Sequence, residues 1–298
     1  MIWGIPYLFI RVAVAEISPA TLVFARTVIA ASILLPIALI RTDVRAVLER
    51  WRWVVAFAAI EIGGPWVLLG SAEQRISSSL AGLLVAGVPL VATVIAVATG
   101  GVDRLGRTGL LGLLVGLAGV AAIVGVNLGS SSPTVLLEMG LVVVGYAVGP
   151  AILARRLAGV STVAVMALSL SLCALIYAPI AALQRPSVMP SAGALGAVAV
   201  LGLVCTAAAF LLFSALIEEI GPVRATVITY LNPAVATVLG VAVLNESFTA
   251  GMGIGFGLVI LGSLIATRPH PSHVGRLSHE IDDGIAFRAP GGDTDRRP

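Results

Sequence analysis

Long apolar stretches alternate along the chain with short segments that hold most of its charged residues. A helix crosses the hydrocarbon core of a bilayer with about 20 predominantly apolar residues. Ten stretches approach or reach that length, at residues 2–15, 20–40, 53–71, 78–99, 109–127, 134–153, 162–183, 193–216, 223–244 and 250–267. The pattern predicts an all-α polytopic membrane protein with ten transmembrane helices.

The first stretch is short, since about 14 residues at about 1.5 Å each do not span a core about 30 Å thick. We expect either a tilted helix in a thinned bilayer or a start upstream of Met1. A signal peptide cleaved near residues 13–15 is disfavoured, because Arg11 interrupts the run and no basic segment precedes it.

Composition supports the membrane interpretation and excludes several other classes. Hydrophobic residues make up 58% of the chain and charged residues 11%, against about 25% charged residues in a soluble domain. Two cysteines, Cys173 and Cys205, lie in apolar stretches and are expected to be small core residues rather than a disulfide. The arginines are scattered, so no nucleic-acid surface is predicted.

Arginine placement predicts the orientation, because cytoplasmic loops of membrane proteins are enriched in basic residues. With a cytoplasmic N-terminus, nine loop arginines fall inside and two, Arg75 and Arg185, fall outside. The inside set is Arg41, Arg45, Arg50, Arg52, Arg104, Arg107, Arg155, Arg156 and Arg224. We therefore expect both termini to be cytoplasmic.

An internal repeat appears when the chain is shifted by 143 residues. The shift pairs Ser18 with Ser161 and Pro36 with Pro179, and it pairs Gly112 with Gly255 and Gly119 with Gly262. Each unit holds five helices, an odd number, so the second copy is inverted, as in many secondary transporters. We expect five-helix repeats at residues 1–131 and 132–267, followed by a disordered cytoplasmic tail at 268–298, whose polar composition cannot form a core.

Several short motifs follow one another in a characteristic order over residues 2–267. They are Trp3-Gly4, Arg11, Arg26, Ser78-Ser79-Leu80-Ala81 leading to Pro89, Asn232-Pro233, and Asn245-Glu246. In this order the chain resembles the EamA-type branch of the drug/metabolite transporter superfamily. One departure is that the first repeat has Gly100-Gly101-Val102-Asp103 where the family commonly has a Gly-Glu-type acid.

The resemblance implies a secondary transporter of the bacterial plasma membrane that exports small organic solutes, such as amino acids, metabolites or drugs, by alternating access. An importer, or an exchanger of organic phosphates or nucleotide sugars, belongs to the same superfamily and stays open. A non-transporting receptor or scaffold is the alternative from another class. Whether the protein is a monomer or a homodimer also stays open.

Three ionisable residues lie clearly within the apolar stretches, namely Arg11, Arg26 and Glu61. A charge at membrane depth costs at least about 2.5–3.5 kcal/mol, so such residues face protein or water. Both arginines are near helix ends, where a long side chain can snorkel to the interface. Glu61 is deeper, and it is either a structural partner of one arginine or a site for substrate or coupling protons.

Other polar and aromatic residues extend the predicted substrate pathway. An aromatic side chain in such a helix lines a cavity or belongs to the interfacial belt, and the belt is favoured for Trp3. The pathway set, besides the three ionisable residues, is Tyr7, Trp66, Tyr146, Thr206, Tyr230 and Asn232.

Prolines and glycines in the same stretches predict helix kinks and close helix packing. The kink set is Pro6, Pro65, Pro89, Pro150 and Pro233, and the packing set is Gly112, Gly116, Gly145, Gly149, Gly251 and Gly255.

Enzymatic functions lack the residues they need. No histidine precedes His270, no aspartate lies in an apolar stretch, and no phosphate-binding glycine motif follows a strand. These absences argue against an intramembrane protease of the aspartyl, serine–histidine or zinc type, and against coupling to ATP. We predict no cofactor and no metal.

Overall fold

The computed structural model describes residues 2–99, 107–127, 132–220 and 231–266, and these segments are helical with short connections. Seven helices within them are long and apolar enough to cross a membrane. Three further apolar helices are shorter, at Ile2–Ala13, Asn232–Leu244 and Ala250–Ala266. The prediction of an all-α membrane protein agrees with this structure, whereas the number of ten spanning helices is not confirmed.

The first half of the chain contains eight α-helices, a short 3₁₀ helix and a π-helical turn in its described part. They are η1 (Ile2–Gly4), α1 (Pro6–Ala13), α2 (Pro19–Arg41), α3 (Val44–Leu48), α4 (Trp51–Phe57), η2 (Ala58–Gly63), α5 (Gly64–Glu73), α6 (Ser78–Val85), α7 (Val88–Ala98) and α8 (Arg107–Asn127). The helices α4, η2 and α5 form one continuous rod of 23 residues, Trp51–Glu73. A π-helical turn therefore lies in the middle of a helix.

The second half follows a similar order of long helices in its described residues. Its elements are α9 (Pro133–Arg156), α10 (Thr162–Leu183), α11 (Ala192–Gly202), η3 (Leu203–Ala208), α12 (Ala209–Ile220), α14 (Asn232–Leu244) and α15 (Ala250–Ala266). A second π-helical turn, η3, again interrupts a long apolar helix. The two-repeat architecture predicted from the sequence fits this arrangement.

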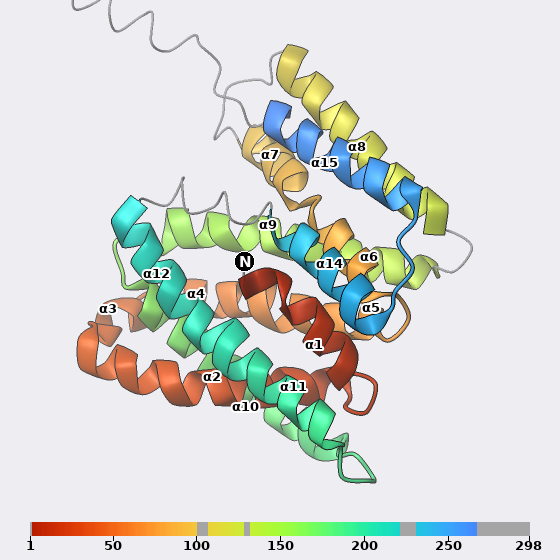
Figure 1. Ribbon diagram of the computed structural model, residues 1–298. Helices are drawn as coiled ribbons and strands as arrows, with labels where there is room; N and C mark the ends of the chain where they lie inside the picture. The colour runs from red at the N-terminus through yellow and green to blue at the C-terminus, as the bar shows by residue number, and fades with distance from the viewer. Residues whose placement is uncertain (1, 100–106, 128–131, 221–230, 267–298) are drawn as a thin grey trace, which may run out of the picture.

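The repeat-related serines begin equivalent helices. Ser18 Oγ accepts a hydrogen bond from the backbone N–H of Thr21 at 3.2 Å, and Ser161 Oγ accepts one from Ala164 at 3.4 Å. Each hydroxyl satisfies a backbone donor that the first helical turn leaves free. The helices that they begin, α2 and α10, pack side by side (Figure 1).

Glycines join α8 to α15, the last helices of the two halves (Figure 1). A Cβ atom on Gly112 would lie 2.8 Å from the carbonyl oxygen of Gly262, and one on Gly119 would lie 2.6 Å from that of Gly255. Backbone atoms cannot move aside as a side chain can, so only glycine allows this approach. A Cβ on Gly116 would collide with the side chain of Leu90. Gly251 is half-buried at the start of α15.

The predicted kink prolines fall into two groups. Pro150 lies inside the long helix α9. The other four stand in the first turns of helical segments, namely Pro6 in α1, Pro65 in α5, Pro89 in α7 and Pro233 in α14. At the start of a helix the missing N–H leaves no bond unmade. Pro65 differs because it follows η2 inside the continuous rod Trp51–Glu73, where it removes a backbone donor. Pro65 and Pro89 thereby mark the points where α4–η2 passes into α5 and where α6 gives way to α7.

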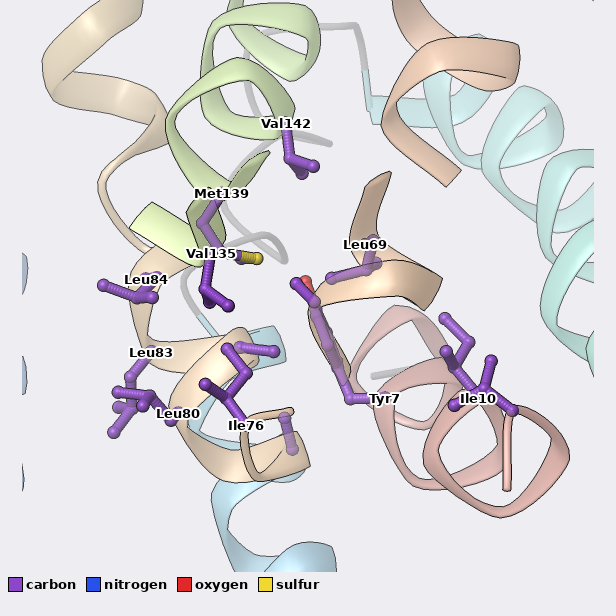
Figure 2. Close-up of a cluster of buried hydrophobic side chains, with 14 of the residues drawn as sticks. Tyr7, Ile10, Leu69, Ile76, Leu80, Leu83, Leu84, Val135, Met139 and Val142 are labelled. Atoms are coloured by element: carbon purple, nitrogen blue, oxygen red, sulfur yellow. The ribbon is translucent and has the colours of Figure 1, made fainter. Parts of the chain in front are cut away.

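The buried apolar side chains form two clusters. Figure 2 shows part of the first, in which Tyr7 reaches from α1 with its hydroxyl end beside Leu69 of α5. The second cluster surrounds α2, η2 and α10 and contains Phe57, Ile62 and Trp66. Tyr146 of α9 packs against both clusters.

Candidate functional site

The two π-helical turns place one polar residue each in the interior, Glu61 in η2 and Thr206 in η3. A π-helical turn inserts one extra residue into a helix and is frequent at functional sites. It also shifts the side chains that follow it around the helix axis. Both turns contact the other half of the molecule, since η2 packs against α9 and α10 while η3 packs against α2.

Arg26 of α2 connects the two halves. Its Nε donates a hydrogen bond to Thr206 Oγ1 at 2.7 Å, and its guanidinium carbon lies 3.6 Å from the centre of the Trp66 ring. Thr206 donates in turn to the carbonyl oxygen of Leu201 at 2.7 Å, so its hydroxyl both accepts and donates a hydrogen bond. Arg26 is only 7% exposed and forms no ion pair with any described residue. Snorkelling to the interface, one interpretation of the sequence, does not describe this side chain.

Glu61 packs against α9 at two glycines. A Cβ on Gly149 would collide with the Glu61 side chain, and one on Gly145 would lie 2.5 Å from the carbonyl oxygen of Ile60. Glu61 Oε2 is buried and finds no hydrogen-bond partner in the described part of the chain. Among the described residues, Glu61 forms no ion pair with Arg11 or Arg26, which was the structural alternative left open by the sequence.

Glu73, at the end of α5, is the buried acid that the sequence analysis missed. It is 0% exposed, and neither carboxylate oxygen has a hydrogen-bond partner among the described residues. Arg11 donates to its main-chain carbonyl oxygen rather than to its carboxylate. The apolar stretch was predicted to end at residue 71, whereas the helix continues through Ser71 and Ala72 to Glu73. The sequence did contain an indication that Glu73 lies in the helix, because only a short gap separates this acid from the next helix, which begins at Ser78.

The remaining predicted pathway residues are spread through the interior. Tyr7 is 6% exposed, and Tyr146 is half-buried. Asn232 begins α14, and its Oδ1 is buried without a hydrogen-bond partner in the segments described. Tyr230 lies outside the described residues.

A small cavity of about 90 Å³ lies beside the N-terminal turn. It is lined by Trp3, Phe213 and Asn232 together with aliphatic side chains of α12. The Trp3 ring, predicted from the sequence to lie in the interfacial belt, packs 4.7 Å from Phe213 and 5.7 Å from Phe210, measured between ring centres. The cavity is apolar with one amide group, and both halves of the chain form it.

Two glutamates bind the N-termini of helices in the opposite half. Asn245 ends α14 in the left-handed conformation, φ 53°, and the following Glu246 accepts hydrogen bonds from the N–H groups of Ser78 and Ser79 at 2.7 and 2.9 Å. Glu16, after α1, accepts bonds from the N–H and hydroxyl of Ser191, both at 2.6 Å. A carboxylate at this position satisfies free backbone donors and the positive end of the helix dipole. We call these two contacts the Glu246 latch and the Glu16 latch.

Both latches stabilise the ionised carboxylate. Hydrogen bonds from the Ser191 hydroxyl and N–H hold the pKa of Glu16 below its usual range. Half-burial by itself raises the pKa of Glu246, but the hydrogen bonds from Ser79 and Ser78 outweigh it and leave that pKa lowered.

An ion pair between Arg75 and Glu138 also joins the two halves. Gln74 Nε2 donates to the Val14 carbonyl at 3.2 Å, which brings the loop before α6 next to the loop of Glu16.

Fold and site together define a helical, multi-pass membrane protein built from two similar halves that share a polar interior. The EamA-like transporter family matches residues 1–125 and 135–268. The chain belongs to this family, and thereby to the drug/metabolite transporter superfamily, whose EamA members are transporters rather than enzymes.

Solved structures support the fold. One, titled "Crystal structure of protein", is 24% identical to this chain and superposes on it with a TM-score of 0.63. The match covers 89% of this chain and 95% of the other. At this identity the likeness bears on the fold alone. None of the curated protein sequences compared with the chain matches it.

Proposed function

We propose that the protein is a secondary transporter that exports a small organic solute from the bacterial cytoplasm by alternating access. The observation that carries the proposal is the set of polar groups left without partners between the two halves. Arg26 uses one of its five N–H donors on Thr206 and forms no ion pair, while Glu61 Oε2 and Asn232 Oδ1 accept no hydrogen bond in the described segments. Charged groups without partners are costly at membrane depth, so a ligand is the natural partner.

The substrate site in this proposal lies around Arg26, Trp66, Tyr146 and Thr206, with Glu61 at its side. Arg26 stacks on Trp66 and bonds Thr206, which fixes the orientation of its planar guanidinium. A guanidinium held in this way offers its two Nη groups to an acceptor of the solute. Tyr7 and the Trp3 cavity then line the route to the site.

Alternating access requires one half to move against the other. The breaks at η2, at η3 and between α6 and α7 are the hinges that we propose, because helices bend where the regular i→i−4 bonding is interrupted. The latches and the Arg75–Glu138 pair close one end of the molecule in this conformation. Opening that end breaks a few polar contacts and leaves the α8–α15 pair intact.

The experiment is solute flux through the purified protein in liposomes, after a comparison of medium metabolites from cells with and without the protein has named candidate solutes. We expect Arg26→Gln to abolish flux and Arg26→Lys to retain a small part of it. Arg52→Gln, in an exposed stretch of α4, is the matched control and leaves flux unchanged. Absence of flux for every candidate solute, with a ligand still bound, would favour the receptor or scaffold alternative.

The orientation is part of the same proposal, with both termini cytoplasmic. Reporter fusions after Ser131 and after Thr267 test it, and we expect the first to report outside and the second inside. An outside signal after Thr267 contradicts both the inverted repeat and the predicted cytoplasmic tail at 268–298, which lies outside the described residues.

A further inference from the structure

Glu73 is the most completely buried acidic side chain of the described residues, with 0% of its surface exposed. Neither carboxylate oxygen accepts a hydrogen bond, and no arginine lies within ion-pair distance in the segments that the structure describes. Arg11 is close by but donates to the main-chain oxygen of the same residue. The carboxyl group is thus held in place by its backbone while its own oxygens stay without partners.

Groups from four other segments face Glu73 within electrostatic range. They are Arg11 and Tyr7 from α1, Arg26 from α2, Tyr146 from α9 and Glu246 from the loop after α14. Two cations and one further acid therefore surround the carboxyl at a distance. None of them neutralises it by direct contact, since the nearest arginine is engaged with the backbone.

We propose that Glu73 is a proton-binding site of the transporter and that proton exchange at its carboxyl is coupled to solute movement; this rests on the proposed function. An ionised carboxylate without hydrogen bonds is costly in such surroundings, and adding one proton removes the charge. The step is a simple transfer, in which a carboxylate oxygen gains a proton from water and later returns it to water, and no electrons move.

A proton fits this site better than a larger cation does. A side chain with no exposed surface leaves no room for the ammonium group of a solute, and Glu73 is not among the residues that line the Trp3 cavity. The described residues hold no group of three or more acidic, histidine or cysteine side chains that could bind a metal ion.

The Glu246 latch determines whether the proton can reach Glu73. Glu73 ends α5, and only residues 74–77 separate it from Ser78 and Ser79, whose N–H groups Glu246 binds. In this conformation the latch is closed and the Glu73 carboxyl has no exposed surface. When α14 and its loop move away from α6, the turn is released and the carboxyl becomes accessible to water on that side. Proton exchange and movement of the two halves are thereby linked.

Infrared difference spectroscopy of the purified full-length protein in lipid tests the site without any solute. A protonated carboxyl gives a carbonyl stretching band that carboxylates lack. We expect this band at neutral pH in the unaltered protein, reduced in Glu73→Gln and unchanged in Glu49→Gln, which alters an exposed acid. Glu61→Gln, recorded in parallel, separates the contribution of the second buried acid. A band unaffected by Glu73→Gln would overturn the proposal.

Flux measurements test the coupling. We expect a pH gradient to stimulate solute flux at least about tenfold less in Glu73→Gln than in the unaltered protein. Glu73→Asp, which keeps a carboxyl, should retain a measurable part of the stimulation. Glu73→Gln replaces a neutral acid by a neutral amide of the same size, so it should remain folded. If it does not, Glu73→Asp supplies the test, because its carboxyl band should persist at a shifted frequency.

The outcomes separate the two proposals. Loss of the band in Glu73→Gln without flux of any solute in the unaltered protein refutes the transporter proposal and keeps proton binding at Glu73. Flux with unchanged gradient dependence in Glu73→Gln keeps the transporter proposal and overturns the coupling at Glu73.

Discussion

The two π-helical turns have the same backbone form at similar places in the two halves, yet they carry different chemistry. Turn η3 carries Thr206, a neutral hydroxyl that accepts from Arg26 and donates to Leu201, so both of its bonding roles are filled. Turn η2 carries Glu61, an acid whose Oε2 is buried without a partner among the described residues. One turn holds a cation, and the other presents an unsatisfied acid.

The difference separates what the two halves share from what they do not share. Local backbone features are kept in both halves, as when Thr93 and Thr237 donate at 2.8 Å to the carbonyls of Pro89 and Pro233. Side chains that face the other half are not kept in this way. Similar helix interruptions therefore surround an interior whose side chains differ between the two halves. Four variants test this difference, and the largest effect is expected first.

The largest effect is expected where η2 packs on α9. Gly145→Leu would drive a side chain into the carbonyl oxygen of Ile60 and the ring of Pro65. Overpacking against backbone costs about 3 kcal/mol at the upper end of the usual range. We expect a large loss of folded protein, measured by thermal unfolding in detergent. The control is Gly140→Leu on the same helix, where a Cβ has no neighbour within 4 Å; equal loss in both variants would contradict the prediction.

The next effect concerns η3. Thr206→Val keeps the shape of the side chain but leaves the Arg26 Nε without its acceptor. A hydrogen bond to a charged group contributes about 1.5–3 kcal/mol, and we expect a loss of stability in that range. Thr206→Ser retains the hydroxyl and serves as the control, with a smaller loss. If valine is as stable as serine, Arg26 is not held by this turn.

A smaller effect is expected at the Glu246 latch. Glu246→Gln removes the carboxylate that binds the first N–H groups of α6, and loss of such a cap costs about 1 kcal/mol. Because the pKa of Glu246 is lowered in the folded protein, its stabilising effect is fully present above the ordinary glutamate pKa. The effect is lost as the pH falls through the lowered value. Unfolding measured from neutral to acidic pH should show the two proteins converging at the acidic end, and a constant difference would contradict this.

The smallest effect on stability is expected for Glu61→Gln. Since the structure holds no ion pair for Glu61 among the described residues, the change should cost less than about 0.5 kcal/mol. The double variant with Arg26→Gln should show additive losses, because the two side chains share no ion pair or hydrogen bond among the described residues. A clear coupling energy between the two positions would restore the structural ion pair that the sequence left open, and would make η2 resemble η3.

Much of the architecture was predictable because it depends on residue types with strong local effects. Charged residues within apolar stretches identified Arg11, Arg26 and Glu61 as candidate residues of the interior, and recurring prolines and glycines indicated the repeat. The partners of Arg26 were not predictable, because Trp66 and Thr206 meet it only when helices from both halves pack together. The π-helical turns were not predictable either, because a single inserted residue leaves no distinct pattern in a uniformly apolar sequence. Glu73 was missed because a helix end cannot be placed to within two residues from hydropathy alone.

The glycine contacts between α8 and α15 have a consequence for how the protein can be divided. Gly112 and Gly119 of one helix meet Gly262 and Gly255 of the other, and these four positions are related by the repeat itself. Such a surface is self-complementary, since each half carries the same pattern that it recognises in its partner. We therefore expect two separately synthesised halves to associate with each other through this surface.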